Sequence, residues 1–112
     1  RNEKHIWTAH SRMKMQYYGI SEGRVKRIIR FPTRYEEGIV PSTIAVMQPA
    51  GTKRYQEIWV MYKLAGQANP KSQTLNHKQK KIKIITAWRF PGRSTERDPI
   101  PQEIIAEVRK LL

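Results

Sequence analysis

The residues best suited to chemistry lie in one short segment, residues 8–21, which carries a histidine near its start. Imidazole titrates near neutral pH and is the side chain most often used as a general acid or base. Arg12, Lys14 and Tyr17 follow His10 within two helical turns, so one surface could offer a proton carrier, cations and an aromatic ring. If this chain is catalytic, we expect His10 to take part.

A structural role explains His10 equally well. Residues three and four apart share one face of a helix, and Ala9, Met13 and Tyr17 form such an apolar series. His10 is close to this series in angle, so its ring could be partly buried and hydrogen-bonded at the start of the helix. The sequence leaves both roles open.

Metal and thiol chemistry have little support in the sequence. The chain has no cysteine, which removes disulfides, thiol nucleophiles and thiolate zinc ligands. The three histidines, His5, His10 and His77, do not have the spacing of metal ligands. We therefore predict no metal site and no cofactor.

Net charge indicates the kind of partner. The 112 residues contain 22 Lys and Arg against 9 Asp and Glu, which gives a formal net charge of +13. Such a charge attracts polyanions, and nucleic acid is the first candidate, although an acidic protein would be attracted in the same way. No window approaches the ~18 consecutive apolar residues of a membrane span, so we expect no membrane contact and a cytoplasmic location.

Two helices are predicted near the start of the chain. Thr8 is a suitable N-cap for a helix over residues 9–18, and Gly19 suits the left-handed residue that ends it. Ser21 can cap a second helix. The inward-facing residues of that helix would be Val25, Ile28 and Ile29. Residues 1–6 have no periodicity and are expected to form a lead-in.

Farther along the chain the apolar pattern changes to a period of two, which is typical of strands. The segments that show it are residues 40–47, 54–64 and 81–90. Pro41 predicts that the first of these is an edge strand or carries a bulge. The Lys-rich polar segment 65–80 is longer than a usual hairpin connection and is expected to be a loop.

The chain would end in a helix that follows Pro99 and Pro101. Its apolar stripe would comprise Ile104, Ile105, Val108, Leu111 and Leu112. The order of elements predicts an α+β fold in which two N-terminal helices pack on a three- to four-stranded antiparallel sheet, followed by the C-terminal helix. We expect a single domain over residues 1–112, with its core at about 7–90 and the helical extension at 99–112.

One face of the predicted sheet combines aromatic and basic side chains. It would contain Lys53, Tyr55, Trp59, Met61, Lys63, Lys81, Lys83, Ile85 and Arg89. Such a surface can hold RNA by ion pairing and base stacking. The alternative is that the C-terminal helix covers the apolar part of this face. Strict alternation would place Trp88 in the core, on the face opposite to Trp59.

Three segments carry a combined pattern: HSRMKMQYYGIS at residues 10–21, RYQEIWVMYKL at 54–64 and KIKIITAW at 81–88. Over about residues 7–88 the chain resembles a small bacterial family of unknown function that is related to the RelE and BrnT toxins. The resemblance implies the fold of the wider group that includes barnase-like and colicin-type nucleases. Active members of that group cleave RNA without a metal.

The resemblance implies a site at which the ribose 2′-hydroxyl attacks the neighbouring phosphorus. Its catalytic residues would be His10 as the general base, with Arg54 and Arg89 in contact with the phosphate. The nucleic-acid contacts would come from Arg12, Lys14, Lys53, Tyr55, Trp59, Lys63, Lys81 and Lys83. Each of these side chains could instead have a structural role, solvated or paired with a neighbour.

Three functions follow from these observations. The first is a toxin-like, metal-independent endoribonuclease of a toxin–antitoxin type system. The second is a non-catalytic basic module that binds RNA or DNA. The third is an interaction module that binds an acidic partner protein, such as an antitoxin. The sequence leaves the oligomeric state open.

Overall fold

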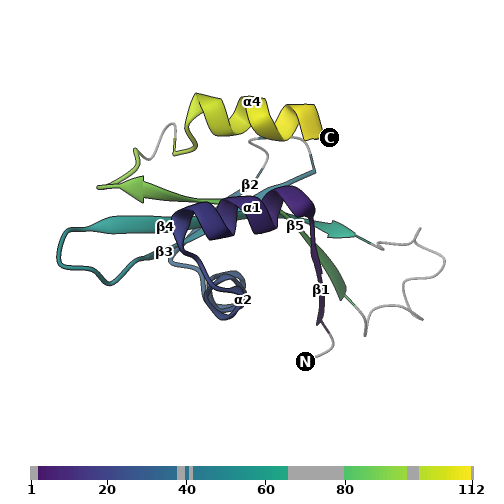
Figure 1. Ribbon diagram of the computed structural model, residues 1–112, viewed down its shortest axis with the longest axis horizontal. Coiled ribbons are helices and arrows are strands. Elements are labelled where there is room, and N and C mark those ends of the chain that lie inside the picture. The colour runs from purple at the N-terminus through teal and green to yellow at the C-terminus, as the bar shows by residue number, and fades with distance from the viewer. Residues whose placement is uncertain (1–2, 38–39, 41, 66–79, 96–98, 112) are drawn as a thin grey trace.

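The structure, a computed structural model, describes residues 3–37, 40, 42–65, 80–95 and 99–111. Its strands are β1 (Glu3–Trp7), β2 (Arg34–Glu37), β3 (Ile44–Pro49), β4 (Gln56–Ala65) and β5 (Lys80–Pro91). They form one sheet in the order β1-β5-β4-β3-β2 (Figure 1). β1 pairs parallel with β5, and the other neighbours pair antiparallel, so the sheet is mixed.

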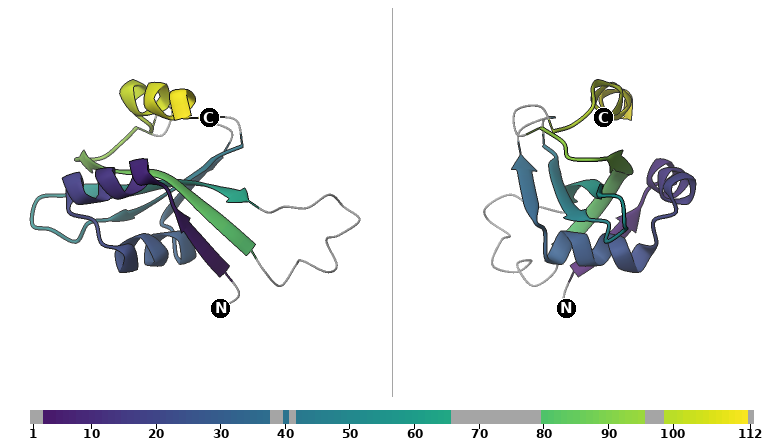
Figure 2. Two further views of the ribbon diagram at one scale, coloured as in Figure 1. Left: turned by 45° about the vertical axis from the view of Figure 1, so that its right-hand side comes forward. Right: turned by 90° about the vertical axis from the view of Figure 1, so that its left-hand side faces the viewer.

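The helices are α1 (Ala9–Tyr18), α2 (Glu22–Arg30) and α4 (Gln102–Leu111). α2 lies on one face of the sheet, α4 lies on the opposite face, and α1 runs beside β5 (Figure 2). The predicted α+β fold, with two N-terminal helices and a C-terminal helix, is therefore confirmed. The predicted sheet of three or four antiparallel strands is wrong, because five strands form a mixed sheet.

The ends of the first two helices are specified locally, as predicted. The Thr8 side chain accepts a hydrogen bond from the Ser11 N–H at 3.1 Å, and Ser21 caps α2 in the same way. Gly19 ends α1 in the left-handed region at φ 68°, and the Ile20 N–H donates to the Met15 carbonyl at 2.8 Å. The Thr8 hydroxyl also donates to the Ile84 carbonyl at 2.7 Å, which joins the start of α1 to β5.

The buried face of α1 is not the one predicted. Ser11 and Met15 are buried, whereas Met13 is 56% exposed and Tyr17 is 77% exposed. Two residues along a helix correspond to a rotation of about 200°, so burial of the 11 and 15 positions turns the 13 and 17 positions to the surface. The apolar series expected to face the core thus faces solvent.

Two hydrophobic cores occupy the two faces of the sheet. The core on the α2 side contains Met15, Ile20, Val25, Ile28, Val46, Ile58, Val60, Tyr62, Ile82, Ile84 and Ala87. The core on the α4 side contains Val40, Ala45, Met47, Trp59, Met61, Ile85, Trp88, Ile100, Ile104 and Val108. α4 therefore covers the apolar part of the second face, which was one of the two alternatives that the sequence left open.

A β-bulge in β5 explains why both tryptophans lie in the same core. Met61 pairs with Thr86 and Tyr62 pairs with Ile84, so Ile85 is an additional residue in β5. One extra residue reverses the alternation beyond that point. Trp88 consequently stacks on Trp59, with ring centroids 5.7 Å apart and planes 1° from parallel. The prediction that the two rings lie on opposite faces is wrong.

The strand predictions need two further corrections. Residues 3–7 form β1 rather than a lead-in, because β5 supplies the hydrogen-bonding partner for a segment with little apolar periodicity. β3 begins at Ile44 and lies between β4 and β2, so it is not an edge strand. Pro41 and most of the predicted loop, residues 66–79, lie outside the described residues.

The junction of α1 with β5 provides a first test. Replacing Thr8 with Ala removes both the N-cap acceptor and the hydroxyl that donates to Ile84. We expect Thr8→Ala to lower the free energy of unfolding by about 1–2 kcal/mol. Thr8→Ser keeps the hydroxyl and should lose less than half of that amount. Urea unfolding measures both variants, and equal stability of Thr8→Ala and wild type would contradict this role.

Candidate nucleic-acid interface

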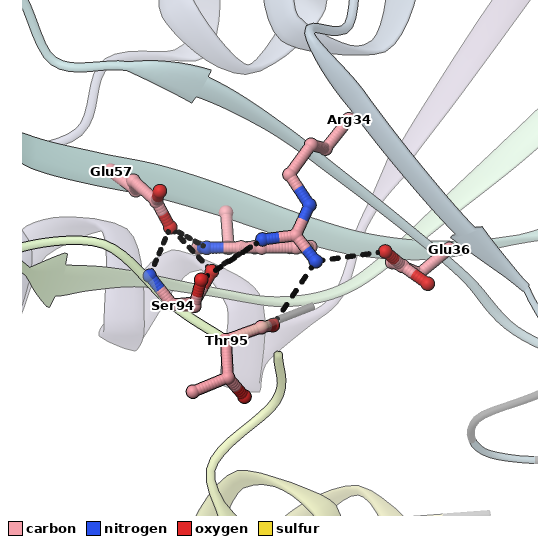
Figure 3. Close-up of polar contacts among 6 residues, drawn as sticks. Arg34, Glu36, Glu57, Ser94 and Thr95 are labelled. Carbon is pink, nitrogen blue, oxygen red and sulfur yellow. Dashed lines mark hydrogen bonds and ion pairs between the residues drawn. The ribbon is translucent and has the colours of Figure 1, made fainter. Parts of the chain in front are cut away.

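A buried carboxylate is the centre of a cluster of polar contacts (Figure 3). Glu57 is 2% exposed and accepts hydrogen bonds at Oε1 from the Ser94 hydroxyl at 2.6 Å and the Ser94 N–H at 3.2 Å. The Trp59 indole also donates to Oε1, at 3.1 Å, and the Tyr55 hydroxyl donates to Oε2, at 3.0 Å. Burial raises the pKa of Glu57, but these hydrogen bonds together hold the pKa below its ordinary value.

Arg34 extends this cluster toward the sheet edge at β2. Its guanidinium donates to the Ser94 hydroxyl at 2.8 Å and to Glu36 Oε2 at 3.0 Å, and it lies 5.3 Å from the Trp59 ring centroid (Figure 3). Glu57, Arg34 and Glu36 all form hydrogen bonds or ion pairs within the protein. The Glu57 cluster therefore holds Ser94 and Thr95, just after β5, against the sheet, and it leaves little capacity to bind a ligand.

A second charged region has the opposite character. It lies on the α4 side of the sheet, at the end of β1, β4 and β5 that α4 does not cover, and we call it the lysine face. Its residues are Lys4, Lys63, Lys81 and Lys83. Lys63 stands directly opposite Lys83, and Lys4 stands opposite Lys81, so each cross-strand pair carries two like charges.

Alternation along the strands places these four lysines on one face. Met61 on β4 belongs to the core on the α4 side, and Lys63 is two residues farther along. Ile82 and Ile84 on β5 belong to the opposite core, so Lys81 and Lys83 point to the α4 side. Parallel pairing with β5 then places Lys4 on the same side.

The charge of the lysine face is not neutralised within the described part of the chain. None of the ion pairs found there involves these four lysines. The segment 66–79, which joins β4 to β5, contains no Asp or Glu and adds two lysines. Like charges directly opposite each other on a sheet are destabilising, so this arrangement has a cost in the free protein.

The three predicted catalytic residues are not brought together. His10, in the first turn of α1, has a side chain that is 17% exposed, and its Nε2 lies 3.5 Å from Glu107 Oε1 of α4. Arg89 donates to the Tyr18 carbonyl at 3.0 Å and 3.2 Å, so it binds the other end of α1. With a rise of ~1.5 Å per residue, the backbones of His10 and Tyr18 are roughly 12 Å apart. Arg54 is exposed in the turn before β4.

The predicted nucleic-acid contacts outside the lysine face have varied surroundings. Arg12 pairs with Glu22 at 2.8 Å, and Lys14 lies 3.5 Å from Glu107. Lys53 is exposed. Tyr55 is half-buried and donates its hydroxyl to Glu57, and burial followed by this hydrogen bond raises its pKa.

Trp59 cannot serve as a stacking surface in this fold. Its side chain is fully buried, and its ring stacks on Trp88 beneath α4. A nucleobase would have to displace the helix to reach it. Of the residues predicted for the mixed basic and aromatic face, Lys63, Lys81 and Lys83 are the ones that form the lysine face.

Sequence reasoning missed several residues of both clusters. Lys4 was overlooked because residues 3–7 do not show a clear strand pattern, although Lys-x-Ile alternation from Lys4 to Ile6 is a weak signal of one. The buried Glu57 and its partner Ser94 are 37 residues apart, and no local pattern connects them. The position of Glu57 beside a run of apolar strand residues indicates that it could be buried, and a buried carboxylate needs hydrogen-bond donors.

Three further findings concern metal ions, membrane-spanning helices and known proteins. The described residues contain no group of three or more His, Cys, Asp or Glu placed to hold a metal ion. In the same part of the chain, no helix is both long enough and apolar enough to cross a membrane. Comparison with protein-family models, curated protein sequences and solved structures found no match. The resemblance to the RelE and BrnT group therefore stays a prediction.

The lowered pKa of Glu57 leads to a pH-dependent prediction. A carboxylate with a depressed pKa stabilises the fold above its unfolded pKa of ~4.3, and this contribution is lost as the pH falls through the folded pKa. Glu57→Gln removes the charge but keeps the size of the side chain. We expect it to lower the free energy of unfolding at pH 7 by about 2–3 kcal/mol.

The measurement is urea unfolding of both proteins between pH 7 and pH 3. The gap between wild type and Glu57→Gln should be largest at neutral pH and should narrow as the solution becomes acidic. A gap that stays constant over this range would show that the ionised carboxylate does not stabilise the fold.

Proposed function

We propose that this protein is an RNA-binding domain and that the lysine face is its principal contact surface. The observation that carries the proposal is the placement of four lysines on three adjacent strands, in two like-charged cross-strand pairs, without an ion-pair partner among the described residues. A polyanion would relieve this repulsion. Neutralisation of phosphates also releases counterions, which supplies most of the sequence-independent affinity for nucleic acid.

The shape of the surface favours a single strand as the ligand. Lys4 and Lys81 are exposed and Lys63 and Lys83 are half-buried on strands of the sheet, and no described helix carries these lysines toward a duplex groove. A flexible strand can follow such a surface with its phosphates on the cations, as in other sheet-based RNA contacts. An acidic protein would compete for the same lysines, so its binding is an alternative outcome of the same tests.

Endoribonuclease activity is a second proposal, and one observation favours it. His10 Nε2 lies 3.5 Å from Glu107 Oε1, and an imidazole beside a carboxylate is a common arrangement for a general base. Two observations oppose a catalytic site at His10. Arg89 donates to the Tyr18 carbonyl at the far end of α1, and Arg54 lies in the turn before β4. We therefore favour RNA binding over RNA cleavage as the function.

Neutralising the centre of the lysine face should weaken RNA binding. For the double variant Lys63→Gln, Lys83→Gln we expect the affinity for a single-stranded RNA to fall at least tenfold at moderate salt. The slope of log K against log salt concentration should become shallower by about 1.4, because each lost phosphate contact removes ~0.7 for a single strand. Fluorescence anisotropy over a salt series measures both quantities.

A matched control removes two exposed basic residues from α2, on the other side of the sheet. Lys26→Gln, Arg30→Gln has the same net charge as the lysine-face variant, and its affinity should fall by less than threefold. The free energy of unfolding of the lysine-face variant should also be higher than that of wild type by a few tenths of a kcal/mol, because like charges no longer oppose each other. Equal loss of affinity in both variants would contradict a localised contact surface.

A single incubation of RNA with the purified protein distinguishes RNA binding from RNA cleavage. We expect RNA to remain intact with the purified protein while it is bound. Cleavage that disappears in His10→Ala, under conditions where His10→Ala still binds RNA, would establish the endoribonuclease instead. Gel electrophoresis of end-labelled RNA distinguishes the two results.

A further inference from the structure

We infer that Tyr17, on α1, is a stacking site for a nucleobase of single-stranded RNA. The inference rests on the proposed RNA-binding function and adds a second contact to it, one that recognises bases rather than phosphates. It accounts for the most exposed large hydrophobic side chain among the described residues, since Tyr17 is 77% exposed and faces away from both cores.

The Tyr17 ring is held by its neighbours rather than loose in solvent. It makes an edge contact with Tyr18, with ring centroids 4.8 Å apart and planes at 89°. Tyr18 is half-buried and packs against both cores, so it is a fixed support. Lys14 Nζ lies 5.9 Å from the Tyr17 ring centroid and 5.4 Å from that of Tyr18. A restrained aromatic ring loses little conformational freedom when a base stacks on it.

β5 connects the lysine face with the end of α1 that carries Tyr17. Two contacts hold α1 along β5: Thr8 with Ile84 near its start, and Arg89 with Tyr18 at its end. α1 contains no acidic residue, and its cations pair with other helices: Arg12 lies 2.8 Å from Glu22 of α2, and Lys14 lies 3.5 Å from Glu107 of α4. From Lys83 to Arg89 the strand extends about 20 Å, a distance that ~6 stacked nucleotides would cover at ~3.4 Å each.

Charge and size argue for RNA as the occupant. The net charge of +13 attracts a polyanion and opposes association with a second copy of this chain. Met13 and Tyr17 are the exposed large hydrophobic residues of α1, and two side chains bury far less than the roughly 1,200 Å² of a stable protein interface. A single base needs only one ring face.

The experiment compares two ligands that share phosphates but not bases. One is an oligouridine of about 12 nucleotides, which exceeds the estimated path along β5 and α1. The other is inorganic polyphosphate of similar length. Each is titrated with wild type, Tyr17→Ala, Tyr17→Phe and, as a matched control, Phe31→Ala, which removes another exposed aromatic ring that lies just after α2.

For oligouridine we expect Tyr17→Ala to raise Kd about tenfold, the range found for loss of one base–aromatic stack. Tyr17→Phe and Phe31→Ala should stay within twofold of wild type. For polyphosphate all four proteins should bind equally. Alanine at an exposed helical position keeps the fold, which circular dichroism checks.

Two results would overturn the inference: unchanged oligouridine binding by Tyr17→Ala, or an equal loss of polyphosphate binding. The lysine-face variant shows whether the proposed function has failed as well. If Lys63→Gln, Lys83→Gln still weakens oligouridine binding while Tyr17→Ala does not, only the stacking site is wrong. If wild type binds neither ligand, both the site and the RNA-binding function are wrong.

Discussion

The buried carboxylate of Glu57 holds Ser94, just after β5, against the sheet. A carboxylate removed from water is unfavourable unless donors surround it, and Ser94, Trp59 and Tyr55 provide four such bonds. Through Ser94 and Arg34 these bonds link the chain just after β5 to β4 and β2. α4 packs on the same face of the sheet, over Trp59 and Trp88. Lys63 and Lys83 lie on that face toward the other end of β4 and β5.

The sheet face on the α4 side has two ends with different surroundings. At one end Trp59 and Trp88 stack under α4, and at the other Lys63 and Lys83 oppose each other without a carboxylate among the described residues. Opposite charges across these strands would stabilise the sheet, whereas like charges directly opposite each other destabilise it. The free protein keeps an arrangement that weakens it locally, and a polyanionic ligand gives a physical reason for that.

Local sequence signals predicted the helices well, because caps act over three or four residues: Thr8 and Gly19 begin and end α1 as expected. Long-range features were missed. The bulge at Ile85 and the burial of Trp59 depend on strand partners and on α4, which no window of sequence contains. The lysines of β4 and β5 were predicted as nucleic-acid contacts. Lys4 was missed with its strand, since pairing to β5 rather than periodicity makes that segment a strand.

Lysine reactivity in the RNA complex tests the central claim most directly. Brief acetylation of the free and RNA-bound protein, followed by mass spectrometry, reports how far RNA protects each amine. We expect Lys4, Lys63, Lys81 and Lys83 to become protected together, whereas Lys26 on α2 keeps its reactivity. Protection spread evenly over all lysines, or concentrated on α2, would show that the lysine face is not the RNA contact surface.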